Sequence, residues 1–327
     1  MLKGALIGYG AEAAEIYAPA LLAGDSPLEI QAVAGRGQEE LSAAAGKFPG
    51  ARVYGGAREL LSAERGLDFA AVALPQSERA ACIMLALENR LHVISHPPFC
   101  FSTGEFDRLK QAADNSGRTL FSAQPWERSS PCRALAKAIG AGLPGEILRA
   151  EIRIMTPRPA GRGRAEGVTA ALGWQAFSLL LGAVRRPPVA IAARLGLELP
   201  YGPGATESEA SFQVYFGGAT GSVHLAAGAH APRFQATVIG KKGLVEISGG
   251  RLRLDLLGHK EETLSLRENL AEGLARPQWL LQEFKDFSAE IENPALRGSG
   301  LKNSRYCVKL LKNAYYSAGV NSAAVPL

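Results

Sequence analysis

The chain has 327 residues, and at roughly 100 to 200 residues per domain this length predicts two domains or one large one. Apolar residues make up 47 % and charged residues 20 %, proportions that exclude a disordered or fibrous chain and predict a soluble globular protein. The net charge of +5 suits anionic small molecules, but clustered basic tracts are missing, so we expect no nucleic-acid partner.

Cysteine usage and the N-terminal residues bear on the compartment. Glycines and glutamates interrupt the first apolar run from residue 8 onward, too early for a signal peptide, and no stretch approaches the roughly 18 apolar residues of a membrane span. The cysteines are scattered without zinc-ligand spacing, so we expect a reducing, cytoplasmic setting, no metal site and no membrane partner. They are Cys82, Cys100, Cys132 and Cys307.

The first 123 residues alternate between apolar strands and helical segments. Strands are predicted at 5–7, 28–34, 53–54, 69–74, 91–95 and 119–123. Helices are predicted at 11–23, 38–48, 57–63, 77–89 and 103–113. Continuous apolar strands separated by helices predict an α/β domain with a parallel sheet covered on both faces.

After Pro125 the rhythm changes to strands joined mostly by short turns. These strands are predicted at 147–155, 189–195, 210–216, 221–227, 234–239 and 244–247. Helices are predicted at 169–181, 278–292 and 301–318. The second half is therefore an α+β domain with a large, mostly antiparallel open sheet, and the boundary divides the chain into residues 1–123 and 124–327.

A glycine-rich turn follows the first strand and opens the first helix. Gly8 permits a tight turn, Gly10 leaves room for a diphosphate, and Ala13 lets the helix pack close to the strand, in the pattern G-x-G-x-x-A. Helix N-termini attract anions, so this segment predicts a dinucleotide site. The alternative is that the glycines serve only the turn. The predicted coenzyme contacts are Gly8, Tyr9, Gly10, Ala11, Glu12 and Ala13.

The end of the second strand lacks the acid that usually binds the ribose of NAD. Gly35 stands at that position and Arg36 follows it. A guanidinium group matches a 2′-phosphate, so the sequence favours NADP over NAD as the coenzyme. The alternative is a solvated arginine at a loop tip.

Four further segments, together with the turn, resemble the glucose-fructose oxidoreductase, inositol dehydrogenase and MocA-like family, Gfo/Idh/MocA. The resemblance covers nearly the whole chain and rests on the order and spacing of the motifs. The segments are Tyr17–Leu21, Leu74–Gln76, Leu143–Ile147 and the turn Gly240–Gly243 with the strand after it.

The resemblance implies a Rossmann domain in residues 1–123 and a substrate-binding and oligomerisation domain in 124–327, with helices 278–318 packing back toward the first domain. It also implies NAD(P) in the crevice between domains, with contacts from Leu74, Pro75, Gln76 and His96. Homodimers or homotetramers through the second sheet are implied too. The implied reaction is hydride transfer between nicotinamide and a sugar, a cyclitol or a hydroxy or oxo acid.

Both catalytic motifs of the family are altered in this chain. In the E-K-P tripeptide after the fifth strand, His96 replaces the glutamate and Pro97 replaces the lysine that assists proton transfer. In the D-x-G-x-H-x-x-D motif, Ala171 and Ser178 replace the acids and Gln175 replaces the histidine. Each such group is worth roughly 10²- to 10⁴-fold in rate, so the usual proton route is lost.

His96 is the candidate replacement acid/base, because it follows a parallel strand where ligands bind and because an unperturbed imidazole can exchange protons near neutral pH. Gln175 is the candidate group for orienting the substrate, since an amide donates and accepts hydrogen bonds. Alternatively, both residues only support local structure. Further predicted substrate contacts are Gln124, Trp126, Arg128, Trp174 and Arg162, the last in a loop with Arg158 and Arg164. We expect the remaining histidines to be structural: His92, His224, His230 and His259.

The sequence thus predicts an NAD(P)-dependent oxidoreductase that moves protons through His96 or water. The main alternative is a catalytically weakened, coenzyme-binding relative that acts as a sensor, partner subunit or scaffold. Non-redox chemistry through a transiently oxidised intermediate is a third hypothesis.

Overall fold

A computed structural model describes residues 1–157, 167–197, 206–273 and 276–327. The chain forms two compact units. Unit 1 contains Met1–Pro125 and Ala275–Arg305, and unit 2 contains Trp126–Leu274 and Tyr306–Leu327. Among the described residues, no helix is both long and apolar enough to cross a membrane.

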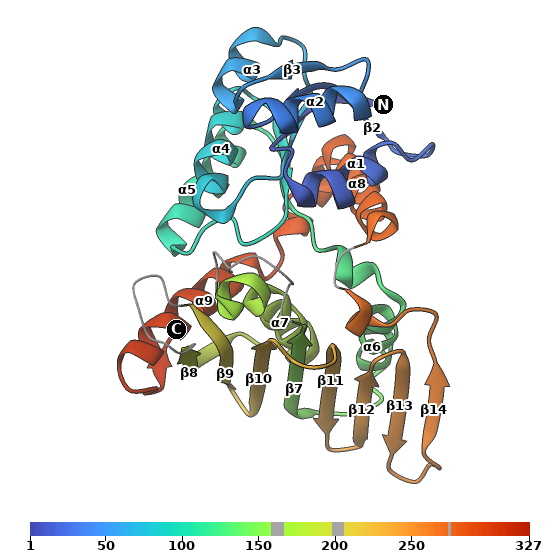
Figure 1. Cartoon of the computed structure of the whole chain (residues 1–327). Helices are drawn as coiled ribbons and strands as arrows, with labels where there is room; N and C mark the ends of the chain where they lie inside the picture. The colour runs from blue at the N-terminus through green and yellow to red at the C-terminus, as the bar shows by residue number, and fades with distance from the viewer. Residues whose placement is uncertain (158–166, 198–205, 274–275) are drawn as a thin grey trace. The chain divides into compact units, whose positions relative to one another are not determined.

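Unit 1 is built on a parallel six-stranded sheet in the order β3-β2-β1-β4-β5-β6. Its strands are β1 (Leu2–Ile7), β2 (Leu28–Ala34), β3 (Arg52–Tyr54), β4 (Phe69–Val72), β5 (His92–Ser95) and β6 (Leu120–Ser122). Every residue of β4 and β5 is buried, as expected when helices cover both faces of a sheet. The predicted doubly wound α/β fold is confirmed (Figure 1).

The helices of unit 1 include one from late in the chain. They are α2 (Gly37–Lys47), α3 (Ala57–Ala63), α4 (Gln76–Glu88), α5 (Thr103–Ser116) and α8 (Pro277–Glu292). Helix α8 packs beside α1 and places Phe284 and Phe287 in the core, where their rings meet those of Tyr17, Phe69 and Phe121 (Figure 1). Two short 3₁₀ turns, η4 (Pro294–Leu296) and η5 (Ser299–Leu301), complete the unit.

The first helix differs from the regular one predicted over residues 11–23. Residues 11 and 12 are helical, a π-helical turn η1 follows at Ala13–Tyr17, and α1 covers Ala18–Leu21. Pro19 accounts for the irregularity, because it has no N–H to donate to the carbonyl four residues earlier and its ring crowds that carbonyl. The wider π turn relieves this contact.

Unit 2 contains a nine-stranded sheet within the described residues, in the order β14-β13-β12-β11-β7-β10-β9-β8-β15. The strands are β7 (Ile147–Thr156), β8 (Pro188–Leu197), β9 (Glu207–Phe216), β10 (Ala219–Ala227), β11 (Arg233–Gly240), β12 (Gly243–Ser248), β13 (Arg251–Leu256), β14 (Glu262–Ser265) and β15 (Val325–Pro326). Only the β7–β10 pair among them is parallel, which confirms the predicted, mostly antiparallel sheet.

Helices cover one face of this sheet. They are α6 (Ser130–Gly140), α7 (Val168–Val184) and α9 (Ser304–Gly319), with 3₁₀ turns η2 (Pro125–Arg128) and η3 (Leu270–Glu272). Helix α7 packs on β7, β9 and β10, and a Cβ atom on its Gly173 would lie 2.8 Å from Leu311 of α9. Helix α8 thus belongs to unit 1, and α9 belongs to unit 2 from Tyr306 onward. In α9, the buried Leu311 lies against Gly173 of α7.

Two segments that carried the resemblance contact one another in unit 2. The backbone N–H of Lys242 donates to the carbonyl of Pro144 (2.8 Å), and that of Lys241 donates to the carbonyl of Glu146 (3.0 Å). A Cβ atom on Gly240 would lie 2.2 Å from the Pro144 oxygen, so only glycine fits there. The turn at 240–243 is thereby locked against the start of β7.

Candidate functional site

The glycine-rich turn has the geometry that a diphosphate needs. Gly8 has φ +95°, and a Cβ atom there would lie 2.4 Å from the carbonyl oxygen of Ala73, so no other residue fits. Its N–H donates to the carbonyl of Ala34 (2.8 Å), which fixes the turn to the end of β2. Ala13 is fully buried, as the close packing of helix on strand requires.

The space over Gly10 is open. The nearest atom to a Cβ built there, outside its immediate neighbours, is the Glu40 Oε1 at 3.9 Å. Ala14 donates to the Gly10 carbonyl (3.0 Å), which begins the helix, so the amides of Ala11, Glu12 and Ala13 precede its first backbone hydrogen bond. Open space above a glycine and amides at a helix start fit the diphosphate of a dinucleotide. Tyr9 instead packs edge-on against Phe48, with centroids 6.3 Å apart.

His96 lies beneath this turn. Its Nδ1 pairs with a carboxylate oxygen of Glu12, and its ring lies edge-on to Tyr17 with centroids 5.0 Å apart. The Nε2 atom is buried and has no hydrogen-bond partner among the described residues. Burial alone would raise the pKa of Glu12, but the His96 ring and then the Arg79 guanidinium lower it to about 2. Glu12 is therefore ionised at neutral pH.

Arg79 organises the loops around the site, and sequence reasoning missed it. Only 5 % of this residue is exposed. The guanidinium group donates to the Leu74 carbonyl (3.0 and 2.8 Å) and to the Pro98 carbonyl (3.1 Å), joining the segments after β4 and β5. This holds the segment Leu74–Gln76, which leads into α4, at the same carboxyl edge of the sheet as His96. A single arginine in an alanine-rich helix gave no signal of this role.

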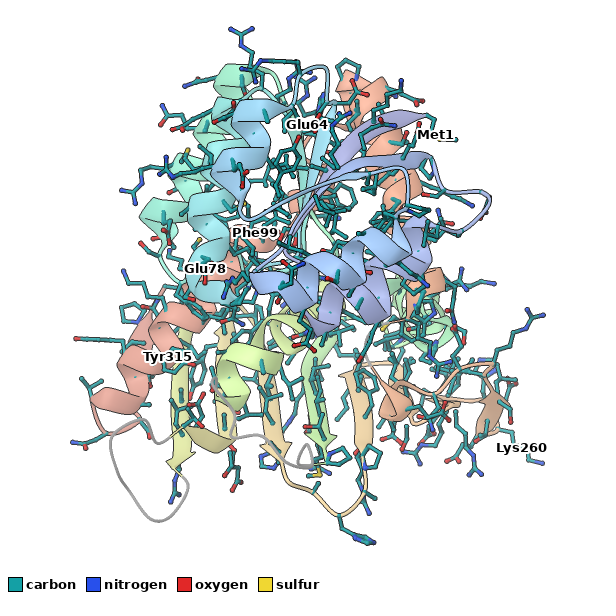
Figure 2. The ribbon with its side chains drawn as sticks, turned by 45° about the horizontal axis from the view of Figure 1, so that its top comes forward. Met1, Glu64, Glu78, Phe99, Lys260 and Tyr315 are labelled. Carbon is teal, nitrogen blue, oxygen red and sulfur yellow. The ribbon has the colours of Figure 1, made fainter. Side chains whose placement is uncertain are left out.

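Arg36 follows the end of β2, as the sequence indicates, but it has a partner. Its guanidinium group pairs with the carboxylate of Glu78 at the start of α4, labelled in Figure 2, and both side chains are half-exposed. Its backbone N–H donates to the Glu40 carboxylate (2.7 Å). Glu40 is a second residue that sequence reasoning missed, because the usual acid stands directly at the strand end.

In unit 2, helix α7 carries the positions of the second altered motif. Ala171 and Gln175, four residues apart, are the only partly exposed residues in the first four turns of this otherwise buried helix. With its amide nitrogen facing carbonyls, Gln175 donates to Leu172 (3.1 Å). Ser178 is buried and donates to a Glu127 carboxylate oxygen (2.8 Å). Trp174 is fully buried, which favours packing over substrate contact.

The remaining predicted substrate residues are dispersed. Gln124 belongs to unit 1, and its backbone N–H donates to the buried Glu283 (3.0 Å). Trp126 and Arg128 form part of η2 in unit 2, and Trp126 is 2 % exposed with its Nε1 unpaired among the described residues. The loop arginines lie outside the described residues: Arg158, Arg162 and Arg164. Across the ranges that the structure describes, no three His, Cys, Asp or Glu side chains are grouped to hold a metal.

The turn and its sheet define a dinucleotide-binding domain of the oxidoreductase class. Residues 2–124 match the family model described as the oxidoreductase family with an NAD-binding Rossmann fold. The resemblance to the Gfo/Idh/MocA family seen in the sequence is thus confirmed for these residues. An uncharacterized oxidoreductase of Rhizobium meliloti is 29 % identical over 120 residues, which is 37 % of this chain and 35 % of that relative.

Solved structures share the fold of the whole chain. An oxidoreductase from Agrobacterium radiobacter in complex with NAD⁺, L-tartaric acid and magnesium is 21 % identical, with a TM-score of 0.80, and 99 % of this chain and 98 % of that chain are covered. A levoglucosan dehydrogenase in complex with NADH and L-sorbose is 16 % identical, with a TM-score of 0.84, and 100 % and 99 % are covered. At these identities the likeness shows the fold alone.

Proposed function

We propose that this protein is an NAD(P)-dependent oxidoreductase acting on a small polar substrate, a sugar, a cyclitol or a hydroxy or oxo acid. The observation that carries the proposal is the turn at residues 8–13. Only glycine fits at position 8, and the space over Gly10 is open. Two structures of the same fold hold a sugar or a hydroxy acid with NADH or NAD⁺, which supports this substrate class.

The residues of the turn would hold the coenzyme diphosphate with the amides of Ala11, Glu12 and Ala13, and the segment 74–76 would line the same edge. When bound, the coenzyme supplies the hydride donor or acceptor. The reaction also needs a proton to be taken from or given to the substrate, and side chains of the protein carry out this transfer.

His96 is the proposed acid/base. Glu12 accepts a hydrogen bond from the Nδ1–H group of His96. Neutral His96 then carries its lone pair on Nε2, the atom without a partner among the described residues. A carboxylate that fixes the tautomer of a histidine also stabilises the ring when Nε2 takes up a proton. Gln175 would orient the substrate through its amide without exchanging a proton.

A catalytically weakened relative, acting as a sensor, partner subunit or scaffold, is the second candidate. The partly exposed strip of α7 offers only Ala171 and Gln175, and neither side chain titrates. Pro97, at the lysine position, cannot exchange a proton either. This candidate predicts coenzyme binding without turnover.

A substrate panel separates the two candidates. Purified protein is incubated with NAD⁺ or NADP⁺ and sugars, cyclitols or hydroxy acids, and reduced nicotinamide is followed by absorbance. The proposal predicts that turnover at saturating coenzyme falls at least about 100-fold in His96→Asn, whereas the exposed His259→Asn leaves the rate unchanged. Coenzyme binding without turnover on any substrate would favour the second candidate.

Finer predictions remain part of the proposal. We propose a cytoplasmic protein without nucleic-acid or membrane partners, and a homodimer or homotetramer formed through the second sheet. In support, this sheet has a cavity of about 380 Å³ lined by residues such as Arg153, Arg194 and His224. Sedimentation of the wild type against Arg194→Glu tests the oligomer. The preference for NADP, predicted from Arg36, depends on whether the Arg36 guanidinium leaves its partner Glu78 to bind a 2′-phosphate.

A further inference from the structure

The strand end at Gly35 lacks an acid, but a carboxylate reaches the same place from helix α2. We infer that Glu40 is the group that binds the adenosine ribose, and that it makes the protein select NAD over NADP. The inference rests on the proposed coenzyme function and names the specificity of that site.

One hydrogen bond and the space beside two glycines define the position of Glu40. Its Oε2 accepts the backbone N–H of Arg36 (2.7 Å), which ties the carboxylate to the end of β2. Its Oε1 lies 3.9 Å from the point where a Cβ atom on Gly10 would stand, beside the open space of the glycine-rich turn. A Cβ atom on Gly35 would lie 3.2 Å from the Glu40 Cβ and 3.4 Å from Oε2, so the glycine leaves the room that this side chain fills.

The charges around this point favour a ribose over a 2′-phosphate. A carboxylate accepts hydrogen bonds from two vicinal hydroxyl groups, whereas it repels a phosphate group. Arg36, the residue that would attract the phosphate, is already paired with Glu78. Recruiting Arg36 to NADP would therefore break an ion pair and bring the phosphate toward Glu40.

Glu40 also satisfies the start of α2, and a purely local role must be separated from ribose binding. Glu40→Gln retains an oxygen for the Arg36 N–H but removes the charge. Glu39→Gln is the matched control, because Glu39 is the neighbouring, exposed carboxylate in the first turn of the same helix.

The test is calorimetric titration of NAD⁺, NADP⁺ and 2′-deoxy-NAD⁺ into the intact protein. We expect the wild type to bind NAD⁺ at least about tenfold more tightly than NADP⁺ or 2′-deoxy-NAD⁺, since hydrogen bonds to charged groups are the stronger ones. Glu40→Gln should weaken NAD⁺ binding about tenfold and leave NADP⁺ equal or tighter, and adding Glu78→Gln should tighten NADP⁺ further. Glu39→Gln should change neither coenzyme.

Three results would overturn the inference. These are wild type that prefers NADP⁺, wild type that binds 2′-deoxy-NAD⁺ as tightly as NAD⁺, and Glu40→Gln that lowers the melting temperature while the NAD⁺ to NADP⁺ affinity ratio stays constant. If Glu40→Gln does not fold, the affinities of the wild type for the three coenzymes still test whether the protein selects NAD⁺ through its 2′-hydroxyl group. Binding of neither coenzyme contradicts the proposed function itself, whereas binding of both with equal affinity contradicts only the role of Glu40.

Discussion

The glycine-rich turn of unit 1 and the exposed strip of helix α7 in unit 2 agree to different degrees with the pattern of the family that the sequence resembles. The turn keeps each feature that its role requires: a positive φ at Gly8, space over Gly10 and a buried Ala13. Helix α7 packs on the sheet, but Ala171, Gln175 and Ser178 stand where the resemblance leads one to expect two acids and a histidine. Coenzyme binding depends on backbone geometry, whereas proton transfer depends on particular side chains.

The difference also tells where a replacement can arise. A carboxylate can reach the ribose position from α2 because Gly35 leaves room for Glu40, and a histidine can take a carboxylate partner from the turn, as His96 does with Glu12. Chemistry lost at one position of a fold can thus be supplied by a neighbouring element.

The strongest test of the comparison is to damage the turn itself. Gly8→Val places a branched side chain at φ +95° and against the Ala73 carbonyl, and we expect it to lower the free energy of unfolding by at least about 3 kcal/mol and to abolish coenzyme binding. Chemical denaturation and calorimetry measure the two effects. A folded variant with wild-type affinity would show that the turn is not the coenzyme site.

A matched change in unit 2 should affect stability alone. Gly173→Val pushes α7 against the fully buried Leu311, so we expect a loss of about 2 kcal/mol in the free energy of unfolding with coenzyme affinity unchanged. Gly182→Ala, on the same helix with open space around it, is the control and should be neutral or slightly stabilising. Weaker coenzyme binding in a folded Gly173→Val protein would break the separation between the two regions.

Acid should loosen unit 1 through His92. Burial, followed by the charges of Arg118 and Arg297, lowers the pKa of His92 from 6.5 to about 4, so the folded state keeps the ring neutral while the unfolded chain takes up a proton below pH 6.5. Stability is then full above pH 6.5 and falls as the pH drops toward 4. At pH 5 the loss is up to about 2 kcal/mol, reduced by solvent screening.

Hydrogen exchange measures this effect segment by segment. Peptides from β5 and β6 should exchange faster at pH 5 than at pH 7, after correction for intrinsic rates, because His92 accepts the Thr119 N–H (3.0 Å) between these strands. In His92→Asn the extra loosening between pH 7 and pH 5 should disappear. If His92→Asn showed the same pH dependence of exchange, the loosening would be caused by titratable groups other than His92.

Much of the fold could be predicted from the sequence because its signals are local. Continuous apolar strands, the spacing of Gly8, Gly10 and Ala13, and the change of rhythm after Pro125 predict the two architectures. Helix α6 was missed although Ser129 caps it by accepting the Cys132 N–H (3.3 Å). Strand β13 was missed although its charged and apolar residues alternate strictly. Strand β14 was missed because its four residues are all exposed and show little pattern.

The site was less predictable, because its contacts join distant segments. Arg79 and Glu40 act through carbonyls and amides that only the folded chain brings together, and nothing in their local sequence marks them. The altered motifs were visible in the sequence, since the family pattern assigns the positions. The pairing of His96 with Glu12, which lies 84 residues earlier in the chain, was not visible in the sequence.

The most direct test of the central claim, that residues 8–13 bind the coenzyme diphosphate, is calorimetric titration of NAD⁺ into wild type and Gly10→Val. Gly10 lies outside the positive-φ region and has open space around it, so valine should leave the fold intact while filling the room that the diphosphate needs. We predict saturable binding to the wild type and at least about 100-fold weaker binding to the folded variant. Equal affinities, or no binding to the wild type at millimolar NAD⁺ and NADP⁺, would contradict the account.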